Sequence, residues 1–291
     1  MIYMNNLKKQ NIGKQNIIKK NIGKQNIVKQ NIVKKNNNKT IFSSNSIALI
    51  KNPLLLKNNP EFPKFKYEGS DGFKCVKFAL EKDQKIRADA GAMNYMSDQI
   101  ELETTSGNML TGIGRMFSGS SFFYNIFHNK TDKRGDISFS GINPGNIGCF
   151  YIPHGKSFNL VDDTYICSSP NLDIKTHIRF GGLIMGYGLA FVNVTANNGG
   201  GLIFGASFGD VIEIVLNKGD SIKVDNGVLL GFEANMKFNT HPIGGFMSTL
   251  FSGEGLVSKI RNDNDIPITL YLQSRSKTAY NNYIRTISKM K

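Results

Sequence analysis

Residues 75–104, CVKFALEKDQKIRADAGAMNYMSDQIELET, decide the fold because their pattern recurs twice further along the chain. Residues 147–176 align with them without a gap at an offset of 72, and residues 211–240 align with 147–176 at an offset of 64. Aligned apolar residues lie two positions apart, which is the spacing of a β-strand. The aligned sets are Ile86, Phe158 and Ile222; Ala88, Leu160 and Val224; Ile100, Leu172 and Met236; and Leu102, Ile174 and Phe238.

Two turn positions between these strands are also filled alike in the three copies. Glycine and aspartate occupy both, and these residues tolerate the positive φ that tight turns require. Because turns and apolar faces recur together, the repeat is interpreted as a folding unit. The first position is Asp83, Gly155 or Gly219, and the second is Gly91, Asp163 or Gly227.

Each copy continues with a shared glycine (Gly119, Gly186 or Gly253) and a further apolar alternation, so about six short strands are expected per copy. Helical periodicity is scarce between residues 65 and 276, and the fold class predicted is all-β. We expect three tandem β-sandwich or barrel modules, at about 65–140, 141–205 and 206–276. Such small modules are expected to share one core.

The net charge of +14 belongs to the ends of the chain. Residues 1–60 contain 12 Lys and no acidic residue, and residues 277–291 form a basic tail with four basic residues and no acid. The central part therefore has 20 basic against 22 acidic residues. A basic groove for a phosphate backbone is not supported, and no sequence-specific nucleic-acid binding is expected.

The first 60 residues form a Lys-, Asn- and Ile-rich leader in which lysines recur every five residues, as at Lys14, Lys19 and Lys24. This period fits neither a helical stripe nor one face of a strand, so the leader is predicted to be disordered. A basic, acid-free leader is typical of a mitochondrial presequence, although such presequences favour Arg. A mitochondrial location is therefore the first expectation and a cytoplasmic one the alternative. Secretion is not expected, because a continuous apolar segment is lacking.

Residues 180–209 lack charge and are the strongest candidate for a membrane span. Their apolar part, residues 181–194, is too short to cross a bilayer, and the polar run Asn197-Asn-Gly-Gly-Gly201 separates it from the next apolar residues. A buried β segment is predicted here, and no transmembrane helix.

Side chains that carry chemistry form no recognisable constellation. Cys75, Cys149 and Cys167 are an odd number without a C-x-x-C pair and are expected to be reduced and mostly buried. The four histidines lack metal-ligand spacing, and the glycine clusters lack the Lys-Ser/Thr of a phosphate loop, so no metal, cofactor or catalytic residue is predicted. The candidate carboxylates for an enzyme are Asp89, Asp162, Asp163, Asp225, Glu233 and Glu254, several of them beside the repeated turns.

Three segments resemble one known family. They are Ala88-Asp-Ala-Gly-Ala-Met-Asn-Tyr-Met96, the turn Gly253-Glu-Gly-Leu256, and the strand pair from Leu216 to Leu230. The chain resembles the AIM-type mitochondrial biogenesis family over roughly residues 65–276. The resemblance implies three modules with the fold of the tryptophan RNA-binding attenuation protein (TRAP) about a pseudo-threefold axis. It also implies an association with mitochondrial membrane organisation, and it supplies no catalytic residues. RNA binding does not follow from likeness of fold.

Three functions remain open at this point. The first is a non-catalytic scaffold or interaction protein, with protein partners or an anionic membrane surface. The second is an uncharacterised enzyme, and the third is nonspecific binding of nucleic acid or anionic surfaces through the basic tails. The oligomeric state is left open, because a chain with three copies is as compatible with a monomer as with an assembly.

Overall fold

The computed structural model describes residues 46–52, 56, 62–103, 124–180, 189–241 and 257–289, and two short strands before them. The chain divides into two compact units, residues 1–44 and 45–291. In the first, β1 (Lys35–Asn36) pairs antiparallel with β2 (Lys39–Thr40). The second unit contains the other elements.

The second unit is built mainly of strands, and those from β5 to β22 fall into three sets of six. The first set is β5 (Cys75–Leu80), β6 (Lys85–Asp89), β7 (Met93–Met96), β8 (Ile100–Glu103), β9 (Tyr124–Asn129) and β10 (Gly135–Phe139). The second set is β11 (Ile147–Ile152), β12 (Ser157–Val161), β13 (Tyr165–Ser168), β14 (Asp173–Phe180), β15 (Leu189–Thr195) and β16 (Gly201–Ala206). The third set is β17 (Val211–Leu216), β18 (Ser221–Asp225), β19 (Leu229–Glu233), β20 (Lys237–His241), β21 (Val257–Arg261) and β22 (Ile268–Gln273).

The pairing of strands is the same in every set, and all of it is antiparallel. The sixth strand lies between the first and third, as in β5–β10–β7, and the fifth lies between the second and fourth, as in β6–β9–β8. The other sets repeat this as β11–β16–β13 with β12–β15–β14, and as β17–β22–β19 with β18–β21–β20. Each set therefore contributes two groups of three paired strands.

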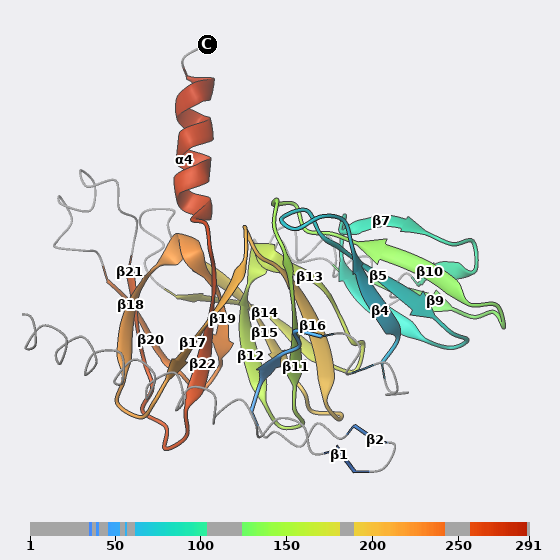
Figure 1. Cartoon of the computed structure of the whole chain (residues 1–291), viewed down its shortest axis with the longest axis horizontal. Coiled ribbons are helices and arrows are strands. Elements are labelled where there is room, and N and C mark those ends of the chain that lie inside the picture. The colour runs from blue at the N-terminus through green and yellow to red at the C-terminus, as the bar shows by residue number, and fades with distance from the viewer. Residues whose placement is uncertain are drawn as a thin grey trace, which may run out of the picture. The chain divides into compact units, whose positions relative to one another are not determined.

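Neighbouring sets share sheets, because a second strand pairs with the third strand of the next set. The β6–β13 pair joins sets one and two into the sheet β3-β11-β16-β13-β6-β9-β8. The β12–β19 pair joins sets two and three into the sheet β14-β15-β12-β19-β22-β17. Figure 1 shows these strands as separate open sheets, and none of the described sheets closes on itself.

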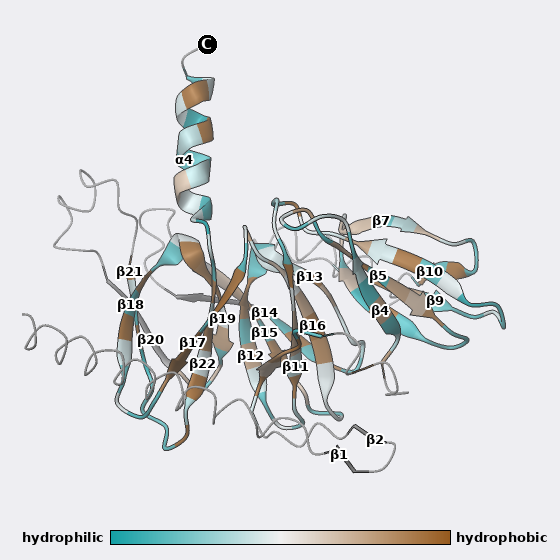
Figure 2. Ribbon diagram, in the orientation of Figure 1, coloured by the Kyte–Doolittle hydropathy of each residue, from teal (hydrophilic) through white to brown (hydrophobic). Residues whose placement is uncertain are grey.

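The core of each set lies between its two sheets. In the second set, Phe150 of β11 and Ile203 of β16 pack against Phe158 and Leu160 of β12. In the third, residues of β17, β19 and β22 pack against Val224 and Ile260 of β18 and β21. Figure 2 shows hydrophobic segments along these strands. Burying one face of each strand accounts for the two-residue spacing in the sequence.

The first repeated turn behaves as predicted. Asp83, Gly155 and Gly219 have φ values of 63°, 76° and 85°. The second turn is not uniform: Gly91 has a φ of 94°, whereas Asp163 and Gly227 lie in the 3-10 turns η3 (Asp162–Thr164) and η5 (Asn226–Val228). The prediction of one shared turn here was wrong, because a 3-10 turn uses negative φ and does not need glycine.

Part of the segment assigned to the leader is ordered. Strand β3 (Ala48–Leu49) pairs with β11, and the side chains of Ile47, Ile50 and Leu56 are buried. The expectation of disorder up to residue 60 therefore does not hold for residues 46–50. The boundary at residue 60 was predicted from the charge of the sequence. The buried apolar side chains of Ile47 and Ile50 instead place this segment in the second unit. The shared glycines Gly119, Gly186 and Gly253 lie outside the described residues.

Two elements flank the three sets. Strand β4 (Lys64–Glu68) precedes the first set and pairs with β5. The helix α4 (Lys277–Ser288) follows β22, where the sequence predicted only a basic tail. Its N-cap is Ser276, whose hydroxyl oxygen accepts a hydrogen bond from the Ala279 N–H at 3.3 Å. The described part of the chain is thus mostly β and includes the helix α4.

Candidate functional site

The six candidate carboxylates do not gather at one place. Asp163 pairs with the ammonium of Lys277, and Asp225 accepts hydrogen bonds from the Gly227 N–H at 2.8 Å and the Ser276 hydroxyl at 3.1 Å. These two carboxylates therefore hold the first turn of α4 and the turn η5. Glu254 lies outside the described residues.

Asp89 and Asp162 influence each other electrostatically. Burial raises the pKa of Asp89 to about 6, the Ala90 N–H opposes this by hydrogen bonding, and the negative charge of Asp162 raises it further. Asp89 is the last residue of β6, beside the junction with β13. Neither carboxylate lies in the cavity described below.

Glu233 ends β19 and is 3% exposed. Burial raises the pKa of its carboxyl, and the ammonium of Lys156 partly offsets that rise. Glu233 lies opposite Phe158 in the β12–β19 junction, so it is part of the packing between two sets.

The three cysteines are free, as predicted, with Cys149 and Cys167 buried and Cys75 partly exposed. Burial raises the pKa of the Cys149 and Cys167 thiols, which keeps them protonated and unreactive. His128 is nearly buried, and its Nδ1 lies 2.7 Å from a carboxylate oxygen of Glu103. Within the described ranges, no three His, Cys, Asp or Glu side chains are grouped to hold a metal ion.

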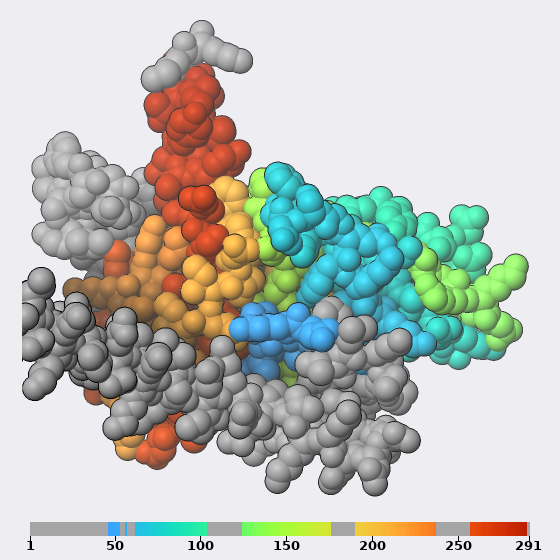
Figure 3. Space-filling model, in the orientation of Figure 1, coloured from blue at the N-terminus to red at the C-terminus, as the bar shows by residue number. Residues whose placement is uncertain are grey.

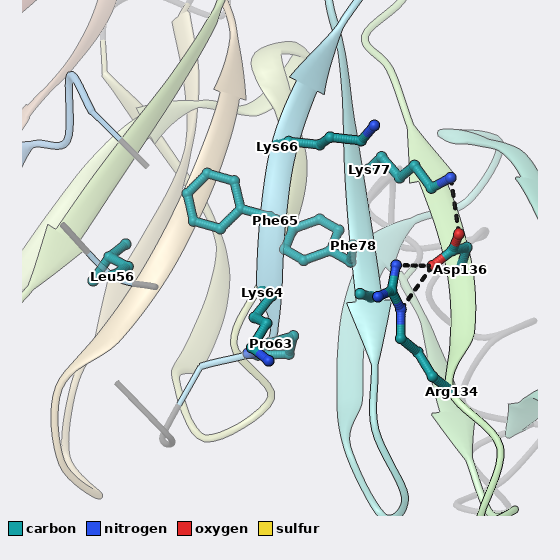
Figure 4. Close-up of a pocket in the computed structure, with 10 residues that line it drawn as sticks. Leu56, Pro63, Lys64, Phe65, Lys66, Lys77, Phe78, Arg134 and Asp136 are labelled. Atoms are coloured by element: carbon teal, nitrogen blue, oxygen red, sulfur yellow. Dashed lines mark hydrogen bonds and ion pairs between the residues drawn. The ribbon is translucent and has the colours of Figure 1, made fainter. Parts of the chain in front are cut away.

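A cavity of about 220 Å³ opens beside β4 and β5 (Figure 4). Its lining includes the apolar side chains of Leu56, Pro63, Phe65 and Phe78. The charged residues of the lining are mostly cationic: Lys64, Lys66, Lys77, Arg134 and Asp136.

Asp136 is the acidic residue of this cavity. Its carboxylate accepts a hydrogen bond from Lys77 at 2.8 Å and another from Arg134 at 3.1 Å. These hydrogen bonds, that of Lys77 foremost, hold its pKa below the usual range, and the same pairing raises the pKa of Lys77. The cavity therefore presents an ionised carboxylate that is paired with two cations.

One face of α4 carries four exposed hydrophobic residues. Tyr280, Tyr283, Ile284 and Ile287 are 43%, 63%, 46% and 40% exposed. Their spacing places them along a single stripe of the helix. Figure 3 shows the atoms of α4 projecting beyond those of the neighbouring strands. The periodicity of these residues could have identified the helix from the sequence.

The base of α4 contacts two connections between strands. Besides the ion pair of Lys277 with Asp163, the Tyr280 ring packs on Phe208, with 5.2 Å between centroids. The rest of the stripe lies beyond these contacts. Arg285 in the last turn and the C-cap residue Lys289 add positive charge, and α4 contains no acidic residue. The helix thus combines an apolar stripe with basic residues, as surface-binding helices do.

No helix among the described residues is long and apolar enough to span a bilayer. Of residues 180–209, which the sequence assigned to a buried β segment, the described part forms β15 and β16, and every residue of β16 is buried. The interpretation as β structure is confirmed for that part.

Fold and site together define a class of protein: open antiparallel β-sheets in three sets, ending in an amphipathic helix. The family model described as mitochondrial biogenesis AIM24 matches residues 65–275. The chain therefore belongs to this family, in agreement with the resemblance found in the sequence.

Two bacterial proteins show similarity over most of the chain. An uncharacterized protein of Streptococcus pyogenes serotype M6 is 24% identical over 219 residues, which cover 72% of this chain and 85% of the relative. The crystal structure of the protein SPYM3_0169 from Streptococcus pyogenes superimposes with a TM-score of 0.63 at 23% identity, covering 79% of this chain and 100% of that one. This second likeness supports the fold alone.

Proposed function

We propose that this chain is a non-catalytic scaffold or interaction protein that binds an anionic membrane surface through α4. The observation that carries the proposal is the exposed apolar stripe of α4 together with its basic residues. Burying Tyr283, Ile284 and Ile287 in the interfacial region removes apolar surface from water. Each nearby cation adds on the order of 1 kcal/mol at an anionic leaflet.

We also propose that residues 65–276 are three copies of one TRAP-like module about a pseudo-threefold axis. The equal strand order and pairing in the three sets support the triplication, and an experimental structure tests whether the copies surround an axis. A stiff, repeated β body is suited to holding several partners at fixed positions. Membership of the mitochondrial biogenesis family supports a place at a mitochondrial membrane, with a role in its organisation.

Vesicle flotation of the full chain tests the membrane proposal. The vesicles are phosphatidylcholine with phosphatidylserine, compared with phosphatidylcholine alone. We expect the chain to float with the anionic vesicles. The bound fraction of Y283E/I284E should fall at least about tenfold, since two charges replace apolar groups that would insert into the bilayer. Both residues are exposed, so the fold is expected to be unaffected.

The matched control is N281E/N282E, which changes the charge of the same helix equally at two exposed residues outside the stripe. It should retain most of the binding. Equal losses in both double variants would show that charge alone drives association. No flotation of the full chain with anionic vesicles would contradict the proposal outright.

The contribution of the lysine-rich leader is measured with a chain that begins at Asn45. This start retains β3, whereas a chain beginning at Glu61 would lose it. Equal flotation of the shortened and full chains would assign the binding to α4.

A further inference from the structure

The two strand pairs that join neighbouring sets in this chain have the same register. At the first, Ala88 of β6 lies opposite Cys167 of β13, and Arg87 lies opposite Ser168. At the second, Leu160 of β12 lies opposite Gly231 of β19, and Asn159 lies opposite Phe232. Leu160 follows Ala88 by 72 residues and Gly231 follows Cys167 by 64, which are the offsets of the repeat. The second strand of one set thus has a fixed way of pairing with the third strand of the next.

The two ends of the row lack such a neighbour. Among the strands that the structure describes, β7 pairs with β10 alone, and β18 pairs with β21 alone. Strand β7 is the third strand of the first set, and β18 is the second strand of the third set. Each end therefore presents the half of the junction that the other end lacks.

Burial separates β7 from its equivalents. All residues of β13 and β19 are buried, whereas all four residues of β7 are exposed. Met93, Tyr95 and Met96 are 39%, 44% and 38% exposed. Exposed apolar side chains on an open strand edge favour pairing with another strand.

The side chains across the third and sixth strands of each set also fit a third junction. One aromatic and one small residue lie opposite each other: Phe204 with Cys167, Tyr271 with Gly231, and Tyr95 with Ser138. The aromatic residue is on the sixth strand in the second and third sets and on the third strand, β7, in the first. Phe204 covers Phe78 with 5.1 Å between ring centroids, and Tyr271 covers Phe150 at 4.7 Å and Phe158 at 5.8 Å.

The residues of the third set that correspond to Phe150 and Phe158 are Ile214 and Ile222. Both side chains pack against the core of that set but are only partly buried. The Tyr95 ring supplies the aromatic group that would cover them.

Charge is complementary at the same place. The Arg87 guanidinium donates hydrogen bonds to the carbonyl oxygens of Leu172, at 2.6 Å, and Pro170, at 2.8 Å, just after β13. The repeat offsets put Lys223 of β18 at the position of Arg87, and Asp98 after β7 at the position of Pro170. Both side chains are exposed. A third junction would bring this ammonium and this carboxylate together.

We propose that a second copy of this chain fills each end, so that β18 of one copy pairs antiparallel with β7 of the next. The register places Val224 opposite Tyr95 and Lys223 opposite Met96. Such a head-to-tail contact is heterologous and repeats from copy to copy, giving a closed ring or an open filament. This inference does not depend on the membrane proposal.

Light scattering of the full chain tests the assembly. We expect a mass of at least twice the 32.3 kDa of one chain. The variant Y95E/M96E should give the monomer mass with an unchanged circular dichroism spectrum, because the substitutions lie at an exposed edge. The matched control I212E/V215E alters β17, another outermost strand whose Ile212 and Val215 are 43% and 49% exposed, and should stay assembled.

Disulfide cross-linking tests the register, in a C75S background that removes the partly exposed thiol. A mixture of M96C and K223C chains should form a covalent dimer on oxidation, since directly paired residues lie within disulfide reach. M96C mixed with K259C should not, because Lys259 lies on β21, one strand further from the edge. A monomeric full chain, or equal cross-linking in both mixtures, would overturn the proposal.

Discussion

Strands β19 and β7 occupy the same place in their sets but differ in what covers them. Each pairs with the last strand of its own set, β22 or β10. Strand β19 also pairs with β12 of the preceding set and is buried throughout, whereas β7 is exposed throughout. The difference shows that the neighbouring set, rather than the pairing within a set, determines how far a third strand is buried.

The largest expected effect is at the core of the covered junction. Phe158 is fully buried against Phe150 and Tyr271, so Phe158→Ala should lower the free energy of unfolding by about 3–5 kcal/mol. Ile222→Ala, at the equivalent position of the open strand β18, should cost about 1 kcal/mol, because Ile222 is only partly buried. Urea unfolding of each variant measures both values. Similar losses at the two positions would remove the contrast between covered and open edges.

A smaller effect is expected at the polar rim of the first junction. Arg87→Ala removes the donors to the carbonyl oxygens of Leu172 and Pro170 and a guanidinium stacked 4.8 Å from the Tyr124 ring centroid. The free energy of unfolding should fall by about 2 kcal/mol. Lys223→Ala at the open edge should change the stability of the monomer by less than about 0.5 kcal/mol. Denaturant midpoints compare the two, and an unaltered Arg87→Ala midpoint would contradict the role given to this contact.

The smallest effect concerns the carboxyl at the end of β6. Because burial raises the pKa of Asp89 to about 6, the folded state holds a proton that the unfolded state has already released above about pH 4. Stability is therefore lost as the pH rises from about 4 to 6. Asp89→Asn should flatten this slope and raise stability at pH 7 by about 1 kcal/mol, allowing for solvent screening.

Thermal unfolding between pH 4 and pH 7 measures the change at Asp89. The control is Asp225→Asn at the equivalent position of β18, where the carboxylate accepts two hydrogen bonds. Asp225→Asn should not raise the stability at pH 7. A gain of equal size in both variants would argue against burial as the cause.

Much of the β body could be predicted from the sequence, because strands that bury one face repeat their apolar residues at fixed offsets. The first three strands of each set start at those offsets, and the first turn has positive φ in all three copies. What the sequence did not reveal was the second turn, where Asp225 caps η5 and removes the need for a glycine conformation. A side-chain hydrogen bond of this kind has no period to detect.

The surfaces proposed as functional were harder to predict. The tail was judged by its charge, so the stripe at Tyr280, Tyr283, Ile284 and Ile287 was missed, although its spacing is helical. The open edges of β7 and β18 could not be inferred, because Met93-Asn-Tyr-Met96 is no more polar than strands that are buried. Exposure here follows from the absence of a neighbouring set, which is a property of the assembled sheets.

Strand β3 protects the edge of β11 from pairing with strands of other chains. It pairs over two residues, Ala48 with Tyr151 and Leu49 with Phe150, and thereby occupies hydrogen-bonding groups of β11. Cleavage of the chain between residues 50 and 62 would release this short strand and bare the backbone of β11. Proteolytic removal of the amino-terminal segment would then turn β11 into an unpaired edge strand, which is prone to aggregation.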